Sequence, residues 1–355
     1  MFRFLKNVTL IVLAYAAFAF CASTILYHCG LVTPRDEPLA ELKLQAVQDN
    51  DYSMLMVGSS RFYRHLDPEL IEDKLGAAGH DFSVYNMGVP GLWPPRQDKF
   101  LERVEEVTTP KILLVEINKP KSLIGNMRSG SVIRSVDLPA ASEAILISKE
   151  TASDTRTFLE FGGSYFAALL YKYSGIGLFR YALGDETDNI ELAKNRFRHS
   201  EHGYLSLDRE QKTGLGSVGE QKPVKQQELD KQRIENLEKY NADQGRLSPT
   251  LLAKCQAAIE RVDAQGCRLI YVLTPRMGKS DLAAVYPVFD KLPVAHKIDL
   301  SSPNEYPEFY SLRYSFDKGH LNEDGSQLMS IALAEKLDQL LTPTAESQTK
   351  MSATR

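Results

Sequence analysis

Two short polar segments near opposite ends of the chain contain the residue types of a serine-based acyl-transfer site. Ser60 follows an apolar run and the turn Gly58-Ser59, and Asp317 stands three residues before His320. A serine hydroxyl becomes an effective nucleophile when a base takes its proton, and the base needs an acid partner that fixes its tautomer. One loop carrying Asp317 and His320 can supply both groups. These three residues are therefore the candidate nucleophile, acid and base.

The segments around these residues predict an α/β fold with a parallel sheet. Five short apolar runs predict strands at residues 54–57, 82–85, 112–115, 269–273 and 297–300. Helical patterns lie between them, at residues 68–75, 95–107, 249–264 and 325–341. Continuous apolar strands alternating with helices are typical of parallel sheets covered on both faces. We therefore expect a three-layer, doubly wound α/β fold, with Ser60 at the carboxyl end of the first strand, where such folds bind ligands.

The regular alternation breaks over about residues 119–248, a stretch too long for an ordinary connection. It contains an aromatic-rich part, residues 158–183, and then a polar part from residue 184 past residue 225. We interpret it as a partly helical insertion with a flexible polar section, within a domain spanning residues 52–341. The aromatic side chains could rest on a bilayer or a membrane partner, or pack on the insertion's own core. Residues 342–355 are polar and predict a disordered tail.

The N-terminal region has the features of a transmembrane helix. Residues 10–32 contain no Asp, Glu, Lys or Arg and follow Arg3 and Lys6. About 20 mostly apolar residues suffice to cross a bilayer. Positive charge before the span favours a cytoplasmic N-terminus at residues 1–9, a connector at 33–51 and a main domain in the periplasm or outside the cell. A cleaved signal peptide is the alternative, but its apolar region would be shorter and would end in small residues. We predict a retained signal anchor and a single-pass membrane protein.

The composition narrows the classes of partner and cofactor. The net charge is −4, from 42 basic and 46 acidic residues, and no basic block is present. The chain therefore lacks the electrostatic signature of a nucleic-acid-binding protein. The cysteines and histidines show no metal-ligand spacing. We expect neither nucleic acid as a partner nor a metal or organic cofactor.

Taken in order, the motifs resemble those of the SGNH (GDSL-like) hydrolase superfamily. In that family a Gly-Asp-Ser block follows the first strand and an Asp-x-x-His block precedes the last helix. The resemblance covers roughly residues 53–341, interrupted by the insertion, and implies an SGNH/flavodoxin-like sheet. The closing block, residues 317–322 with Gly325, is a specific match, whereas Ser59 stands where the family usually has Asp. Variants with Ser there are similar to the membrane-anchored branch that includes the D-alanyl transfer protein of teichoic-acid modification and exopolysaccharide acylation proteins.

The resemblance also implies an oxyanion hole. The family's second block, Asn then Gly, is matched by residues 86–91, so that the N–H of Gly91 would join that of Ser60, with Gly88 as the alternative. The third block, Gly-x-Asn-Asp, survives only as Asn118, the sole amide near that strand end.

Four further residues are candidate substrate contacts, namely Arg61, Asn86, Trp93 and Lys119. Arg61 begins a polar group that continues with Arg64 and His65. These three residues could instead form a solvated helix face, and Trp93 could instead be part of the core.

The resemblance implies two-step acyl transfer through an acyl-Ser60 intermediate, with water or a sugar hydroxyl as the acceptor. With a main domain outside the cytoplasm, we expect O-acyl, in particular acetyl, modification of a cell-surface polysaccharide. The expected partners are an acyl donor, a polysaccharide acceptor and a multi-span membrane O-acyltransferase. Two alternatives stay open. One is a carbohydrate esterase (deacetylase) or lipase-type esterase, and the other is a non-catalytic assembly or glycan-binding subunit that keeps the fold.

Overall fold

Five parallel strands form a single sheet in the part of the chain that the structure describes. The computed structural model describes residues 2–29, 37–124, 132, 135–173, 187–215, 224–241 and 246–342. The strands are β1 (Met54–Val57), β2 (Val84–Asn86), β3 (Ile112–Glu116), β4 (Arg268–Leu273) and β5 (Lys297–Asp299), in the order β2-β1-β3-β4-β5. This is one of the two common doubly wound orders, in which the switch point lies between β1 and β3. The predicted α/β class with a parallel sheet is confirmed.

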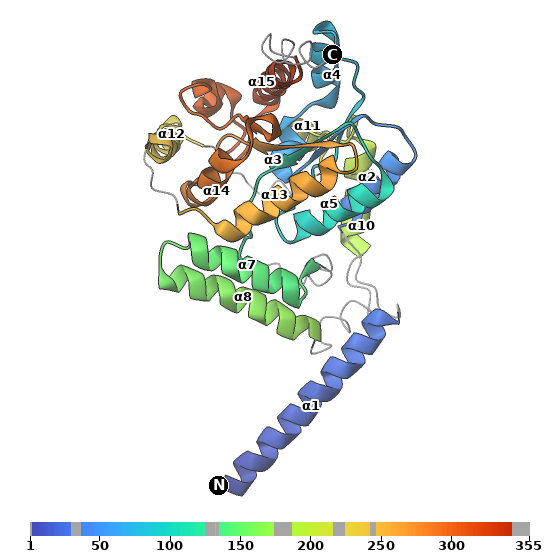
Figure 1. The fold of residues 1–355 in the computed structure, drawn as a ribbon, viewed down its shortest axis with the longest axis vertical. Helices are drawn as coiled ribbons and strands as arrows, with labels where there is room; N and C mark the ends of the chain where they lie inside the picture. Colours follow the sequence, from blue (N-terminus) through green and yellow to red (C-terminus); the bar gives the residue numbers. More distant parts are fainter. Residues whose placement is uncertain are drawn as a thin grey trace, which may run out of the picture.

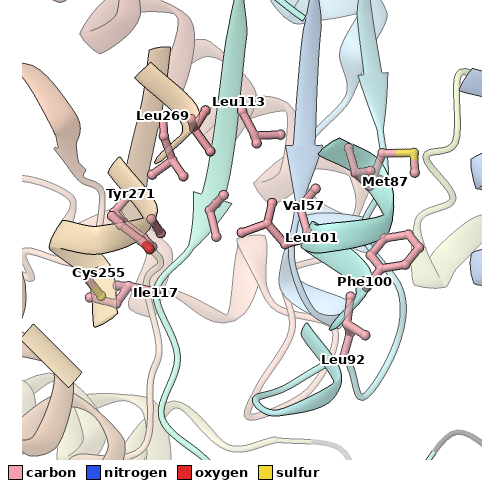
Figure 2. Packing of buried hydrophobic residues seen from close by; sticks show 14 of the residues in the cluster. Val57, Met87, Leu92, Phe100, Leu101, Leu113, Ile117, Cys255, Leu269 and Tyr271 are labelled. Atoms are coloured by element: carbon pink, nitrogen blue, oxygen red, sulfur yellow. The ribbon is translucent and has the colours of Figure 1, made fainter. Parts of the chain in front are cut away.

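Two hydrophobic clusters cover the two faces of this sheet. Successive strand residues alternate between them, so that Leu55 and Val57 belong to one cluster and Met54 and Met56 to the other. The first cluster is closed by helices α2 (Pro38–Gln48), α5 (Arg96–Val107), α13 (Pro249–Asp263) and α14 (Lys279–Lys291). Figure 2 shows part of it packed between strands and helices. The second is closed by α3 (Ser60–His65), α4 (Pro68–Ala77) and α15 (Glu323–Leu341). Burial on both faces is why the strands are continuously apolar in sequence.

The interval 33–51, interpreted from its sequence as a polar connector, contains helix α2. Its side chains Leu39, Ala40, Leu44 and Val47 are buried at helical spacing, and α2 packs against α5 and α10 (Thr187–Arg198). The described part of this interval is thus a layer of the fold. The polar residues of this interval made its short apolar stripe difficult to recognise in the sequence.

Lys43 of α2 joins three segments that are distant in sequence. Its buried ammonium donates hydrogen bonds to the carbonyl oxygens of Asn86 (2.7 Å), Gly88 (2.7 Å) and Gly203 (2.6 Å). These acceptors match the three donors of the ammonium group. Burial holds the pKa of Lys43 well below its usual value. The end of β2 is thereby tied to the loop at residue 203, which belongs to the predicted insertion.

The insertion is helical in the parts that the structure describes. Its remaining helices are α7 (Leu138–Thr151), α8 (Thr155–Tyr173), α11 (Leu207–Lys212) and α12 (Gln226–Asn241). Helices α7 and α8 pair side by side below the sheet domain in Figure 1 and enclose a small core with Phe161 and Tyr165. Two of the predicted aromatic residues therefore pack internally, while Phe166 is 62% exposed. Within the polar part, α10 and α11 fold onto the core through buried Tyr204 and Leu205, where flexible chain was expected.

Helix α1 (Phe2–His28) precedes the sheet domain. In the described parts of the chain, no helix was found with both the length and the hydropathy of a membrane span. Residues 30–36 and 343–355 lie outside the described residues, and they include the predicted end of the span and nearly all of the predicted tail.

Replacing Lys43 by Met should destabilise the fold strongly. Three buried carbonyl oxygens would lose their donor, and an unsatisfied buried polar group costs about 1–3 kcal/mol. We expect the free energy of unfolding, measured by urea denaturation of the full chain, to fall by about 3 kcal/mol or more. Lys74→Met on the exposed side of α4 is the matched control and should change it by less than about 0.5 kcal/mol. Equal effects of the two substitutions would contradict this role of Lys43.

Candidate active site

The three predicted catalytic residues meet at the carboxyl edge of the sheet. Ser60 Oγ lies 3.0 Å from His320 Nε2. On the other side of the ring, His320 Nδ1 lies 2.9 Å from Asp317 Oδ2 and 3.1 Å from Oδ1. When Nδ1–H donates to the carboxylate, Nε2 is left as the acceptor that faces the hydroxyl. This is the arrangement that a nucleophile, a base and an orienting acid require.

The turn after β1 presents Ser60 as the first residue of α3. Ser59 caps the helix, since its Oγ accepts the Arg61 N–H at 3.4 Å. A Cβ on Gly58 would lie 2.6 Å from the ring of Phe62, so only glycine fits before the cap. The N–H groups of a first helical turn have no acceptor within the helix. The Ser60 N–H therefore suits a donor to an oxyanion formed at its own side chain.

The buried carboxylate of Glu116, at the end of β3, stabilises this turn by hydrogen bonds. Its Oε2 accepts the Ser59 N–H at 2.6 Å. Its Oε1 accepts from Arg61 Nε at 2.9 Å and from the Thr274 hydroxyl at 3.2 Å. Glu116 thus fixes both neighbours of Ser60, and Arg61 is engaged in this ion pair. The sequence analysis did not identify Glu116, although an acidic residue that ends an apolar buried strand is a signal of pairing.

The loop with Asp317 and His320 orients its own acid. Asp317 Oδ1 accepts the backbone N–H groups of Gly319 (2.6 Å) and His320 (2.7 Å). Burial by itself would raise the pKa of Asp317. The hydrogen bonds from the His320 side chain and from these two N–H groups outweigh burial and hold the pKa below its usual value. The carboxylate is therefore ionised at neutral pH, as stabilisation of an imidazolium requires.

His65, at the end of α3, supports the same loop. Its Nε2 accepts the Leu321 N–H at 3.1 Å, and its ring meets the His320 ring edge-on at 5.7 Å between centroids. Burial, then the electrostatic influence of His320 and of nearby arginines, holds the pKa of His65 well below its usual value, so it acts as a neutral acceptor. Arg64 is buried in an ion pair with Glu210. For Arg64 and His65, the interpretation as a solvated helix face is therefore wrong.

The second block lies beside the nucleophile turn. The Val89 N–H donates to the Gly58 carbonyl at 2.9 Å, which holds the loop of Gly88 and Gly91 next to Ser60. Gly91 has φ of +74°, and a Cβ on Gly88 would lie 2.4 Å from the backbone N of Tyr63. A side chain at position 91 would therefore meet no neighbouring atom, but the left-handed backbone there favours glycine. Gly88, by contrast, is closely packed.

Two predicted amides have structural contacts. Asn86 is fully buried, where its Nδ2 donates to the carbonyls of Phe62 (2.7 Å) and Leu66 (2.8 Å). This burial corrects the prediction that Asn86 contacts substrate. Asn118 is also buried, with Nδ2 3.2 Å from Gln97 Oε1 and Oδ1 3.4 Å from Arg61 Nη2. The Asn118 amide therefore pairs within the protein, and no hydrogen bond joins it to Ser60.

Trp93 and Lys119 belong to a group of partly exposed side chains that also contains Lys121 and Asp281. Lys119 and Lys121 both pair with Asp281, the former at 3.6 Å. The Lys121 ammonium covers one face of the half-buried Trp93 ring at 5.1 Å from its centroid. Burial lowers the pKa of Lys119. These side chains are partly exposed and are bonded to one another, with no direct bond to the three catalytic candidates.

No group of three or more His, Cys, Asp or Glu suited to a metal ion was found among the residues that the structure describes. The chain matches no protein-family model and no curated protein.

The depressed pKa of Asp317 predicts an acid-dependent contribution to stability. A carboxylate whose pKa is lower in the folded state stabilises the fold fully above its unfolded value of about 3.9. That contribution is lost as pH falls through the folded pKa. The difference in melting temperature between wild type and Asp317→Asn should therefore be largest near neutral pH and shrink below about pH 4. Asp73→Asn, at an exposed position of α4, is the control. A difference that stays constant down to acid pH would contradict the ionised Asp317.

Proposed function

We propose that this chain is an acyl-transfer enzyme that acts through an acyl-Ser60 intermediate. The observation that carries the proposal is the continuous chain of contacts from Ser60 Oγ to His320 Nε2 (3.0 Å) and from His320 Nδ1 to Asp317 Oδ2 (2.9 Å). Glu116 and His65 hold the two ends of this chain in place. Each group has the partner that its role requires.

In the first step, His320 Nε2 takes the proton of Ser60 as Oγ attacks the carbonyl carbon of an ester or thioester. The tetrahedral oxygen carries the negative charge and accepts from the N–H groups of Ser60 and Gly91. Collapse breaks the bond to the alcohol or thiol, which leaves with the proton from His320, and acyl-Ser60 remains. In the second step, His320 deprotonates the acceptor hydroxyl, which attacks the acyl group and regenerates Ser60.

The motif order and the sheet together support membership of the SGNH superfamily as part of the proposal. Ser60 follows β1, and the Asp317–His320 loop directly precedes α15, as the family pattern requires. The doubly wound strand order agrees with it. The departures are Ser59 in the first block, and Glu116 with Asn118 in the third. Glu116 bonds the Ser59 N–H, so that the altered first and third blocks contact each other.

We propose O-acyl, in particular acetyl, transfer to a cell-surface polysaccharide as the reaction. The support is the predicted signal anchor over residues 10–32, which would hold the main domain outside the cytoplasm, and the resemblance to the membrane-anchored branch. Hydrolysis is the second candidate. It is favoured by the exposure of the catalytic pair, which is 26% for the His320 side chain and 22% for Asp317. Water can reach a base that is this accessible.

The covalent step is tested by intact mass spectrometry of the full chain after brief exposure to p-nitrophenyl acetate. Wild type should gain the mass of one acetyl group. Ser60→Ala should gain none, and His320→Ala should acylate more slowly by about a thousand-fold or more. Ser302→Ala, which alters a serine after another strand of the same sheet, is the control and should acylate like wild type.

A folded wild type without any Ser60-dependent adduct would exclude the enzyme and favour a non-catalytic glycan-binding or assembly subunit. Where the adduct forms, adding an oligosaccharide acceptor separates the two candidate reactions. A transferase should release the acyl group faster with the acceptor and yield an acylated glycan. A hydrolase should release it to water at an unchanged rate.

A further inference from the structure

Arg276, in the loop after β4, holds the catalytic loop by its backbone. Its Nη1 donates to the His320 carbonyl at 2.9 Å and to Ser315 Oγ at 3.1 Å. Its Nη2 donates to the Asp317 carbonyl. A guanidinium is planar and presents its donors in a fixed fork. One rigid group is therefore bonded to the main chain of both the acid and the base.

The conformation of Arg276 is unfavourable when considered alone. Its backbone has φ of +59°, a left-handed value that is uncommon for a residue with a long side chain. The residue is 2% exposed, and burial lowers the pKa of its guanidinium to about 10. Strained backbone and a buried charge persist where the surroundings hold them, and they concentrate at functional sites.

Helix α12 of the insertion holds the backbone of this turn. Gln232 Nε2 donates to the Arg276 carbonyl at 3.0 Å. Asn236 Nδ2 donates to the Met277 carbonyl at 3.3 Å and to the Tyr310 hydroxyl at 3.0 Å. Both amide side chains are buried. In Figure 1, α12 lies beside α14, which follows the Arg276 turn.

The first turn of α12 also holds the segment that leads into the catalytic loop. Gln226 Nε2 donates to the Tyr310 carbonyl at 3.0 Å, and its Oε1 accepts the Leu312 N–H at 3.0 Å. The Ser315 hydroxyl, which receives the Arg276 bond, lies three residues further on. One helix of the insertion therefore contacts the chain before the Asp317–His320 loop as well as the arginine that clamps it.

We propose that α12 and Arg276 form a positioning unit that fixes the Asp317–His320 pair relative to Ser60. This inference rests on the proposed acyl transfer and assigns a role to the C-terminal part of the insertion. Without the hydrogen bonds of Arg276, the Asp317–His320 loop can shift, while Ser60, His320 and Asp317 stay chemically unchanged. A misplacement of about 1 Å is enough to lower a rate by about a hundred-fold.

The test compares Arg276→Met and Arg276→Lys with wild type in the full chain, using p-nitrophenyl acetate. Arg276→Met keeps much of the length and removes every donor. We expect kcat to fall by about a hundred-fold while KM changes by less than about threefold, because the loop orients the base and contacts little substrate. Arg276→Lys restores a charge and part of the bonding. It should therefore recover part of kcat.

Lys172→Met is the matched control, because Lys172 is also a buried cation that donates to a carbonyl, that of Val136 at 3.0 Å, within the region of α7 and α8. It should lower the melting temperature and leave kcat of the folded protein unchanged. Gln232→Met removes the α12 bond to Arg276 alone and should lower kcat by about tenfold. It also keeps the inference testable should Arg276→Met fail to fold.

The outcomes separate this inference from the proposed function. Wild type that forms no Ser60-dependent adduct overturns the proposed function itself. Wild type that acylates, with Arg276→Met or Gln232→Met variants that melt earlier yet keep the wild-type kcat, overturns only the positioning unit. A fall in kcat with unchanged KM, partly recovered by Arg276→Lys, supports it.

Discussion

The hydrogen bond between Ser60 and His320 joins two residues that are 260 positions apart, and the rest of the site depends on it. A contact of this range requires the first strand and the last helix to be neighbours. The doubly wound sheet provides this, because β1 lies in the interior of the sheet and α15 packs on the face that also carries α3 and α4. The ends of the domain are thereby brought to one edge. There a proton can pass between two side chains.

The hydrogen bond between Ser60 and His320 requires buried polar residues that hold the two loops in place. Glu116, His65 and Arg276 are all buried, and each forms hydrogen bonds to the main chain or to side chains next to the reacting residues. Buried polar groups of this kind are costly unless they are bonded, and when bonded they stiffen their surroundings. The reacting pair itself is partly exposed. The supporting residues are thus buried, whereas the His320 and Asp317 side chains are partly exposed to solvent.

The sequence was informative where the signal is local. The five strands and the helices at 68–75, 95–107, 249–264 and 325–341 are present, because burial on both faces leaves unbroken apolar runs and regular helical spacing. Ser60, Asp317 and His320 could be proposed from residue type and spacing.

The partners of the supporting residues could not be predicted, because they are remote in sequence. Glu116 meets Ser59 across 57 positions, and Arg276 meets Asp317 across 41. Asn86 and Asn118 were predicted to have functional roles because they follow strands, but in the structure their side chains form hydrogen bonds within the protein. Loops at a buried sheet edge leave main-chain groups that need partners, and amide side chains supply them. The buried side of helix α12 carries Leu229 together with Gln232 and Asn236, whose amides form hydrogen bonds, so the helix shows little apolar pattern in sequence.

This polar character fits the proposed positioning role of the insertion better than the role of a lid. A lid excludes water by presenting apolar surface over the reacting atoms. Gln226, Gln232 and Asn236 instead present hydrogen-bonding amides to loops beside the site, and each of them forms a bond to a backbone atom of these loops. Backbone bonds constrain where a loop lies, without dictating which acceptor enters. Trp93 and Lys119, which are both partly exposed, stay predicted substrate contacts.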